Sequence, residues 1–113
     1  MKKIEMTLEV LMPTQVTKIV EFPIFYKELN GMNSFIAIDV DDMESVYVPY
    51  KIIEVVEYSD TRKRVYIKNV GDKEVSSIIA HADAGGYQQI DKEFFKLKFI
   101  NAIDEYMTTI ENI

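Results

Sequence analysis

The sequence contains no cysteine and no tryptophan, and its only histidine is His81. The lack of cysteine excludes a disulfide framework, a thiolate metal site and a cysteine nucleophile, and it fits a reducing compartment. The sequence also has no Ser/His/Asp set, phosphate-binding loop, dinucleotide fingerprint or zinc motif. We therefore predict that the chain is not an enzyme and that it takes no cofactor.

Long apolar runs are lacking too. The first ten residues read MKKIEMTLEV, and polar residues interrupt the apolar ones at every second position. This pattern is unlike a signal peptide, which needs a continuous apolar region. No other run approaches the length of a membrane span. We expect a soluble, cytoplasmic protein.

The composition is that of one folded domain. The chain has 113 residues, of which 48% are hydrophobic and 28% are charged, so we expect a single domain over residues 1–113. The net charge is −6, which disfavours general attraction to nucleic-acid phosphates. Residues 58–74 are an exception, because five cations and three acids give this segment a charge of +2.

Most of the chain has the patterns of short strands. Ile4, Met6, Leu8 and Val10 alternate with polar residues, which predicts a half-buried strand that ends at Pro13. We predict further strands over residues 16–26, 34–40, 45–58, 64–70 and 75–82. Pro23 and Pro49 are expected to interrupt or bend two of them. The short connections, such as the Asn30-Gly31 turn, favour antiparallel neighbours.

The hydrophobic pattern changes its period from Asp91 onward. Apolar residues recur at steps of three and four, and Asp91 stands where its carboxylate can cap a helix. The sequence thus predicts an α+β fold, in which an antiparallel sheet or small, partly open barrel of about six strands occupies residues 1–90. One amphipathic helix follows over residues 91–112.

The segment that precedes this helix reads AHADAGGYQQI over residues 80–90. His81 and Asp83 would share one face of a strand, where they could act as a base and its orienting partner, or as metal ligands. Gly85 and Gly86 could offer amide groups to an anion. The sequence shows no nucleophile or third ligand to complete such a set. The alternative is a connecting loop, and we predict no metal site.

The run DVDDME over residues 39–44 gathers four carboxylates. A calcium loop that began at Asp39 would need glycine at its sixth position and glutamate at its twelfth. Glu44 and Tyr50 occupy those positions. We therefore interpret this run as a solvated turn between strands.

A basic hairpin is predicted near residue 60. It interleaves aromatic and cationic side chains, namely Tyr58, Arg62, Lys63, Arg64, Tyr66 and Lys68. Three readings stay open: an ordinary exposed hairpin with Val65 and Ile67 on the core side, a surface for a partner protein, and a single-stranded nucleic-acid site.

The apolar stripe of the C-terminal helix is wider than one face of a small sheet requires. It includes three phenylalanines, Phe94, Phe95 and Phe99, together with a tyrosine and several aliphatic residues. Either the sheet wraps around the helix, or part of the stripe is an interface. The second reading predicts a homo-oligomer or a complex with another protein.

Three segments carry a resemblance. They are Phe25-Tyr26-Lys27, the strand FIAIDV, and the closing helix IDKEFFKLKFINAIDEYMTTI. This layout is similar to that of small uncharacterised proteins of bacteriophages and other mobile elements. The resemblance covers most of the chain, and it implies an accessory protein that acts by binding in a bacterial host cell.

Our first functional hypothesis is therefore a non-enzymatic protein-binding protein. It could inhibit a host protein with a basic surface, or it could be a subunit of a larger assembly. The alternative is a single-stranded nucleic-acid-binding protein that uses the Arg62–Lys68 strand. A third hypothesis is a small hydrolase centred on His81 and Asp83.

Overall fold

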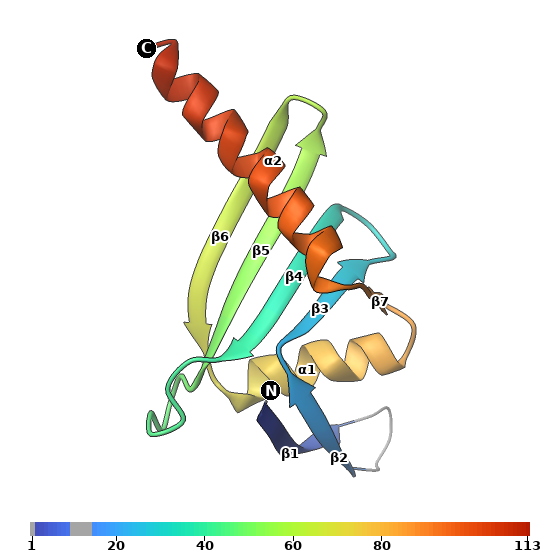
Figure 1. Ribbon diagram of the computed structural model, residues 1–113. Helices are drawn as coiled ribbons and strands as arrows, with labels where there is room; N and C mark the ends of the chain where they lie inside the picture. The colour runs from blue at the N-terminus through green and yellow to red at the C-terminus, as the bar shows by residue number, and fades with distance from the viewer. Residues whose placement is uncertain (1, 10–14) are drawn as a thin grey trace.

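The computed structural model describes residues 2–9 and 15–113. It shows an α+β fold with antiparallel sheets and a C-terminal helix (Figure 1), as the sequence predicts. The elements in chain order are β1 (Lys2–Glu9), β2 (Gln15–Phe22), β3 (Ile24–Glu28), β4 (Asn33–Val40), β5 (Tyr50–Ser59), β6 (Arg62–Val70), α1 (Asp72–Asp83), β7 (Tyr87–Gln89) and α2 (Lys92–Glu111).

The strands form two sheets. β1 and β2 make a two-stranded antiparallel hairpin, and the other strands form a five-stranded sheet in the order β6-β5-β4-β3-β7. Every pair in the larger sheet is antiparallel. This sheet has two edges, β6 and β7, and does not close into a barrel.

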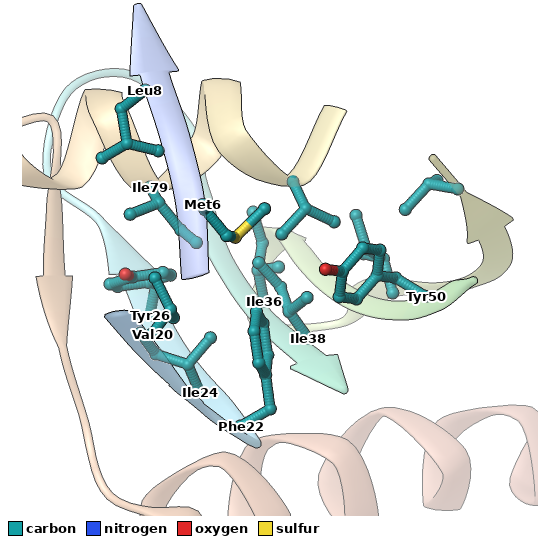
Figure 2. Close-up of a cluster of buried hydrophobic side chains, with 13 residues drawn as sticks. Met6, Leu8, Val20, Phe22, Ile24, Tyr26, Ile36, Ile38, Tyr50 and Ile79 are labelled. Carbon is teal, nitrogen blue, oxygen red and sulfur yellow. The ribbon is translucent and has the colours of Figure 1, made fainter. Parts of the chain in front are cut away.

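Each face of the larger sheet carries its own core. On one face, α1 and the β1–β2 hairpin pack against residues such as Ile24, Ile38 and Tyr50. On the other face, α2 packs against Phe35 and Val55 through Phe95 and Ala102. Figure 2 shows the first core, in which Met6 and Leu8 of β1 lie near Ile79 of α1. Complete burial of one such side chain stabilises the fold by about 1.5–3 kcal/mol.

Helix α1 corrects one prediction. The sequence predicted a last strand over residues 75–82, but this stretch belongs to a helix that runs from Asp72 to Asp83. Val75 and Ile79 are four residues apart and fully buried, so they lie on one helical face. Asp72 and Glu74 lie in the first turn, where the helix dipole favours negative charge. The prediction failed because a short apolar run does not distinguish a strand from a buried helix.

Two predicted strands also differ in extent. The strand predicted over residues 16–26 divides at Pro23, so that β2 pairs with β1 while β3 enters the larger sheet. The predicted strand over residues 45–58 begins only at Tyr50. Residues before Pro49 form a loop in which Val46 and Tyr47 are each 84% exposed. The predicted positions Val10 and Pro13 lie outside the described residues.

The C-terminal helix follows its prediction. The Asp91 carboxylate accepts a hydrogen bond of 2.7 Å from the backbone N–H of Phe94, which makes Asp91 the N-cap of α2. From there α2 crosses one face of the larger sheet (Figure 1), and residues 107–113 are all exposed. Within residues 2–9 and 15–113, no helix is long and apolar enough to cross a membrane.

Candidate interaction surfaces

The segment AHADAGGYQQI is not a loop between a strand and a helix. Its first residues, as far as Asp83, form the last turn of α1, and Tyr87–Gln89 form β7 at an edge of the larger sheet. Gly85 has a φ of +91°, a conformation that side chains disfavour. The Gly86 N–H donates a hydrogen bond of 2.8 Å to the carbonyl oxygen of His81. The two glycines thus serve the turn after α1.

His81 and Asp83 do not form a pair. Residues that are two positions apart on an α-helix point in directions about 200° apart, so the side chains of His81 and Asp83 diverge. His81 Nδ1 lies 2.8 Å from the carbonyl oxygen of Ser77. Asp83 instead pairs with Lys18 of β2 at 3.0 Å, which joins α1 to the β1–β2 hairpin. No group of three or more His, Asp or Glu side chains in the described part of the chain could hold a metal ion.

A cleft of about 690 Å³ lies between β1 and α1. One face of α1, with Lys73, Ser76 and Ser77, lines it, and Tyr50 and Asp72 lie at one end. His81 also lines the cleft, but it is nine positions beyond Asp72, or about 13 Å along a helix axis. Direct proton transfer needs groups within hydrogen-bond reach, so His81 and Asp72 cannot form an acid–base pair.

Tyr50 in this cleft is fully buried, and its hydroxyl has no hydrogen-bond partner among the described residues. Burial, and then the negative charge of Asp72, raise its pKa to about 12. The Asp72 carboxylate is near enough to raise the pKa of Tyr50. Its distance and angle to the Tyr50 hydroxyl do not meet the criteria for a hydrogen bond. The phenol therefore stays neutral at ordinary pH and is a poor proton donor.

The acidic run forms a turn, as expected. The Asp42 carboxylate accepts a hydrogen bond from the Glu44 N–H, and the Asp42 carbonyl accepts one from Ser45. Asp41 bonds to Asn69 at 2.6 Å and pairs with Lys51 at 3.2 Å. The hydrogen bonds from Asn69 and Lys51 lower the pKa of Asp41. Its carboxylate is thus engaged with side chains of β5 and β6.

The basic hairpin joins β5 to β6, and many of its side chains contact one another. The Tyr58 and Tyr66 hydroxyls are 3.1 Å apart, and this hydrogen bond is the main cause that raises the pKa of Tyr66. The Arg62 guanidinium lies 5.5 Å from the centre of the Tyr58 ring. Arg64 and Lys68 approach carboxylates of Glu105 and Glu74, respectively. A base that stacked on Tyr58 would compete with Arg62 for one ring face.

Strand β6 itself is only half covered by α2. The Lys63 N–H donates to the Glu105 carboxylate at 2.9 Å, and the Val65 N–H donates to the Tyr106 hydroxyl at 2.8 Å. Val65 accordingly packs against the second core. Ile67 lies on the same face as Val65, as expected, because it pairs with Ile53. Its side chain is nevertheless 60% exposed.

The outer face of α2 is apolar and acidic. Its inner face buries Phe95 and Ala102, whereas Leu97, Ile100 and Met107 are 55%, 50% and 51% exposed. Their spacing places these three residues on the solvent side. Acidic residues with the same orientation, Glu93, Asp104 and Glu111, are also exposed. We call this set of six residues the outer face of α2.

A second cleft, of about 470 Å³, lies between α2 and the larger sheet. It is lined by apolar side chains and bordered by three lysines and two aspartates, and its members include Phe25, Ala37, Ile53, Phe95, Phe99, Lys51, Lys92, Lys96, Asp39 and Asp41. The sequence reasoning missed this cleft. Its residues come from four separate segments, which the strand register and the packing of α2 bring together.

In comparisons with known proteins, no family model, no curated protein and no solved structure matches this chain. The functional argument therefore depends on the surfaces described above.

Proposed function

We propose that the chain is a non-enzymatic protein-binding module whose main docking surface is the outer face of α2. The observation that carries this proposal is the exposure of Leu97, Ile100 and Met107 by half or more along one side of a well-formed helix. An apolar stripe on a helix is a common recognition element, because it can lie in a groove of a partner. Exposed apolar side chains that cluster in this way favour aggregation unless a binding partner covers them.

Charge indicates the chemistry of the partner. Glu93, Asp104 and Glu111 border the apolar stripe, and the whole chain carries a charge of −6. We infer a partner whose apolar groove is bordered by lysine or arginine. An acidic surface would accelerate association with such a partner and make it sensitive to salt.

A second copy of the chain fits this surface less well. If two α2 helices paired antiparallel about Ala102, Glu93 of one copy would lie near Glu111 of the other. Like charges in contact oppose association. The homo-oligomer expected from the sequence stays a prediction, and we do not place its interface on α2.

The biological setting is also a proposal. The resemblance to phage and mobile-element proteins, together with the acidic surface, supports an accessory role as an inhibitor of a host protein or as a subunit of an assembly. The single-stranded nucleic-acid alternative depends on exposed Tyr58, Tyr66 and Arg62 on one hairpin. The internal contacts of that hairpin and the net charge make it the weaker candidate.

A photo-crosslinking amino acid at Ile100 tests the proposal in the native cells. We expect one discrete crosslinked product that contains a different protein and whose crosslinked peptide is rich in lysine or arginine. The matched control places the same amino acid at Ile19 of β2, which is also exposed. That position should not give this product.

The product should weaken as salt is raised before irradiation, and Leu97→Glu should remove it. Equal products from Ile100 and Ile19, or a product made only of this chain, would argue against the proposal. Crosslinking to nucleic acid at Tyr66 alone would favour the alternative function.

A further inference from the structure

We propose a second binding site that is independent of α2: the uncovered half of β6 accepts an extended acidic segment of a partner protein as an additional strand. This open edge, as we call it, consists of Tyr66, Ile67, Lys68 and Asn69. It is the continuation of the strand whose first half α2 covers.

The backbone geometry supports strand addition. β6 is an edge of the larger sheet, so alternate residues direct their N–H and C=O groups away from β5. The N–H groups of Lys63 and Val65 point outward, because they donate to Glu105 and Tyr106 of α2. Ile67 and Asn69 have the same parity, so their N–H and C=O groups also point outward. An added strand is a common occupant of such an edge.

The side chains define what the added strand should carry. The register aligns Ile67 with apolar side chains across the sheet, through Ile53 and Ala37 to Phe25. A partner residue on this face would extend an apolar row. Tyr66 and Lys68 lie on the opposite face, since successive strand residues alternate. The matching partner sequence therefore alternates apolar and acidic residues.

A helix and a loop limit the length of the open edge. Helix α2 closes it at Val65. At the other end, the loop before Pro49 approaches Gly71, where an added Cβ would lie 2.6 Å from the Tyr47 carbonyl oxygen. About four residues remain, and the three-residue strand β7 pairs with β3 over a similar length at the opposite edge. The exposed side chains of Val46 and Tyr47 belong to this bordering loop.

Charge selects an acidic partner over a second copy. Lys68 is the cation within the open edge, Arg62, Lys63 and Arg64 precede it in β6, and the strand has no acidic residue. Antiparallel pairing of β6 with itself would gather the cations of both strands, which opposes self-association. Lys68 is available for exchange, because its contact with Glu74 is 3.5 Å long and both side chains are more than half exposed. Exposed ion pairs of this kind contribute little.

The probe is a capped, fluorescent eight-residue peptide of alternating glutamate and valine, measured by fluorescence anisotropy with the full chain. We expect it to bind at least tenfold more tightly than a peptide in which lysine replaces glutamate. An N-methylated version, which lacks alternate backbone N–H groups, should bind weakly. Equal binding of the glutamate and lysine peptides would overturn the proposal.

Ile67→Pro is the sharpest variant. It removes an N–H that points away from β5, and proline is tolerated at such edge positions. We expect it to weaken peptide binding at least tenfold, whereas the matched Ile67→Val variant should bind like the wild type. Unchanged binding by a folded Ile67→Pro protein would contradict the proposal.

A second variant, Lys68→Glu, leaves the backbone intact. It should weaken the glutamate peptide severalfold and reduce its preference over the lysine peptide; no change in either would count against the proposal. Ile100→Glu on α2 should not affect the peptide, so the two proposed sites can fail separately. If single-stranded DNA bound and the peptide did not, and if Arg62→Glu, Lys63→Glu and Arg64→Glu together abolished DNA binding, the site would lie on the hairpin outside the open edge, and the proposal would be overturned.

Discussion

At the scale of single residues, Tyr50 combines full burial with a hydroxyl that has no partner within the described structure. A buried polar group without a hydrogen bond costs about 1–3 kcal/mol. We therefore expect Tyr50→Phe to raise the free energy of unfolding by about 1 kcal/mol, as measured by urea denaturation at neutral pH. Tyr47→Phe is the control, because Tyr47 is exposed. If Tyr50→Phe instead lowered the free energy of unfolding by more than about 1 kcal/mol, the hydroxyl would have a hydrogen-bond partner in the folded protein.

The same residue gives a prediction about pH. The pKa of Tyr50 is raised from 10.0 to about 12, chiefly by burial. Between these values the unfolded chain releases a proton that the folded chain retains, so ionisation stabilises the unfolded state. The wild type should thus lose stability as pH rises from about 10 to about 12, and Tyr50→Phe should lose less. Tyr26, whose pKa is also raised to about 12, contributes in the same direction and remains in both proteins. Parallel curves for the two proteins would contradict this assignment.

Individual residues also show where sequence reasoning reaches its limit. The face shared by Arg64, Tyr66 and Lys68 follows from strand alternation, and the structure confirms a strand there. The exposure of Ile67 does not follow from alternation, because it depends on where α2 crosses the sheet. The pairing of Asp83 with Lys18 joins residues 65 positions apart, which no local pattern indicates.

At the scale of elements, the cap of α2 is the clearest local determinant. The Asp91 carboxylate accepts a hydrogen bond from the Phe94 N–H. The helix that it caps packs on the sheet to make the second core. We expect Asp91→Ala to lower the free energy of unfolding by about 1 kcal/mol, the usual cost of losing an N-cap. Asp91→Ser should retain most of the stability, because serine can accept the same hydrogen bond. Equal losses in both variants, measured by urea denaturation, would show that the carboxylate acts in another way.

The elements differ in how well their sequences define them. α2 was predictable because it has twenty residues, a cap and a sustained helical period. α1 was mistaken for a strand because Val75, Ile78 and Ile79 favour either structure over so short a run. The split at Pro23 could be suspected from the proline, but the pairing of β2 with β1 outside the larger sheet could not.

At the scale of the whole molecule, the chain has more surface than its size requires. It exposes 7636 Å², whereas a monomeric protein of its mass, 13.1 kDa, is expected to expose about 6,400 Å². The outer face of α2, the open edge of β6 and the loop before Pro49 all contribute exposed apolar side chains. The first two of these surfaces are the ones on which we propose that partners bind.

The most direct test of the central claim is sedimentation equilibrium of the purified chain, compared with the double variant Leu97→Glu, Ile100→Glu. If the outer face of α2 is free to receive a partner protein, both proteins should have the same mass. A wild type of higher mass, which the double variant returns to 13.1 kDa, would contradict the claim. That result would mean that a second copy of the chain already covers this face.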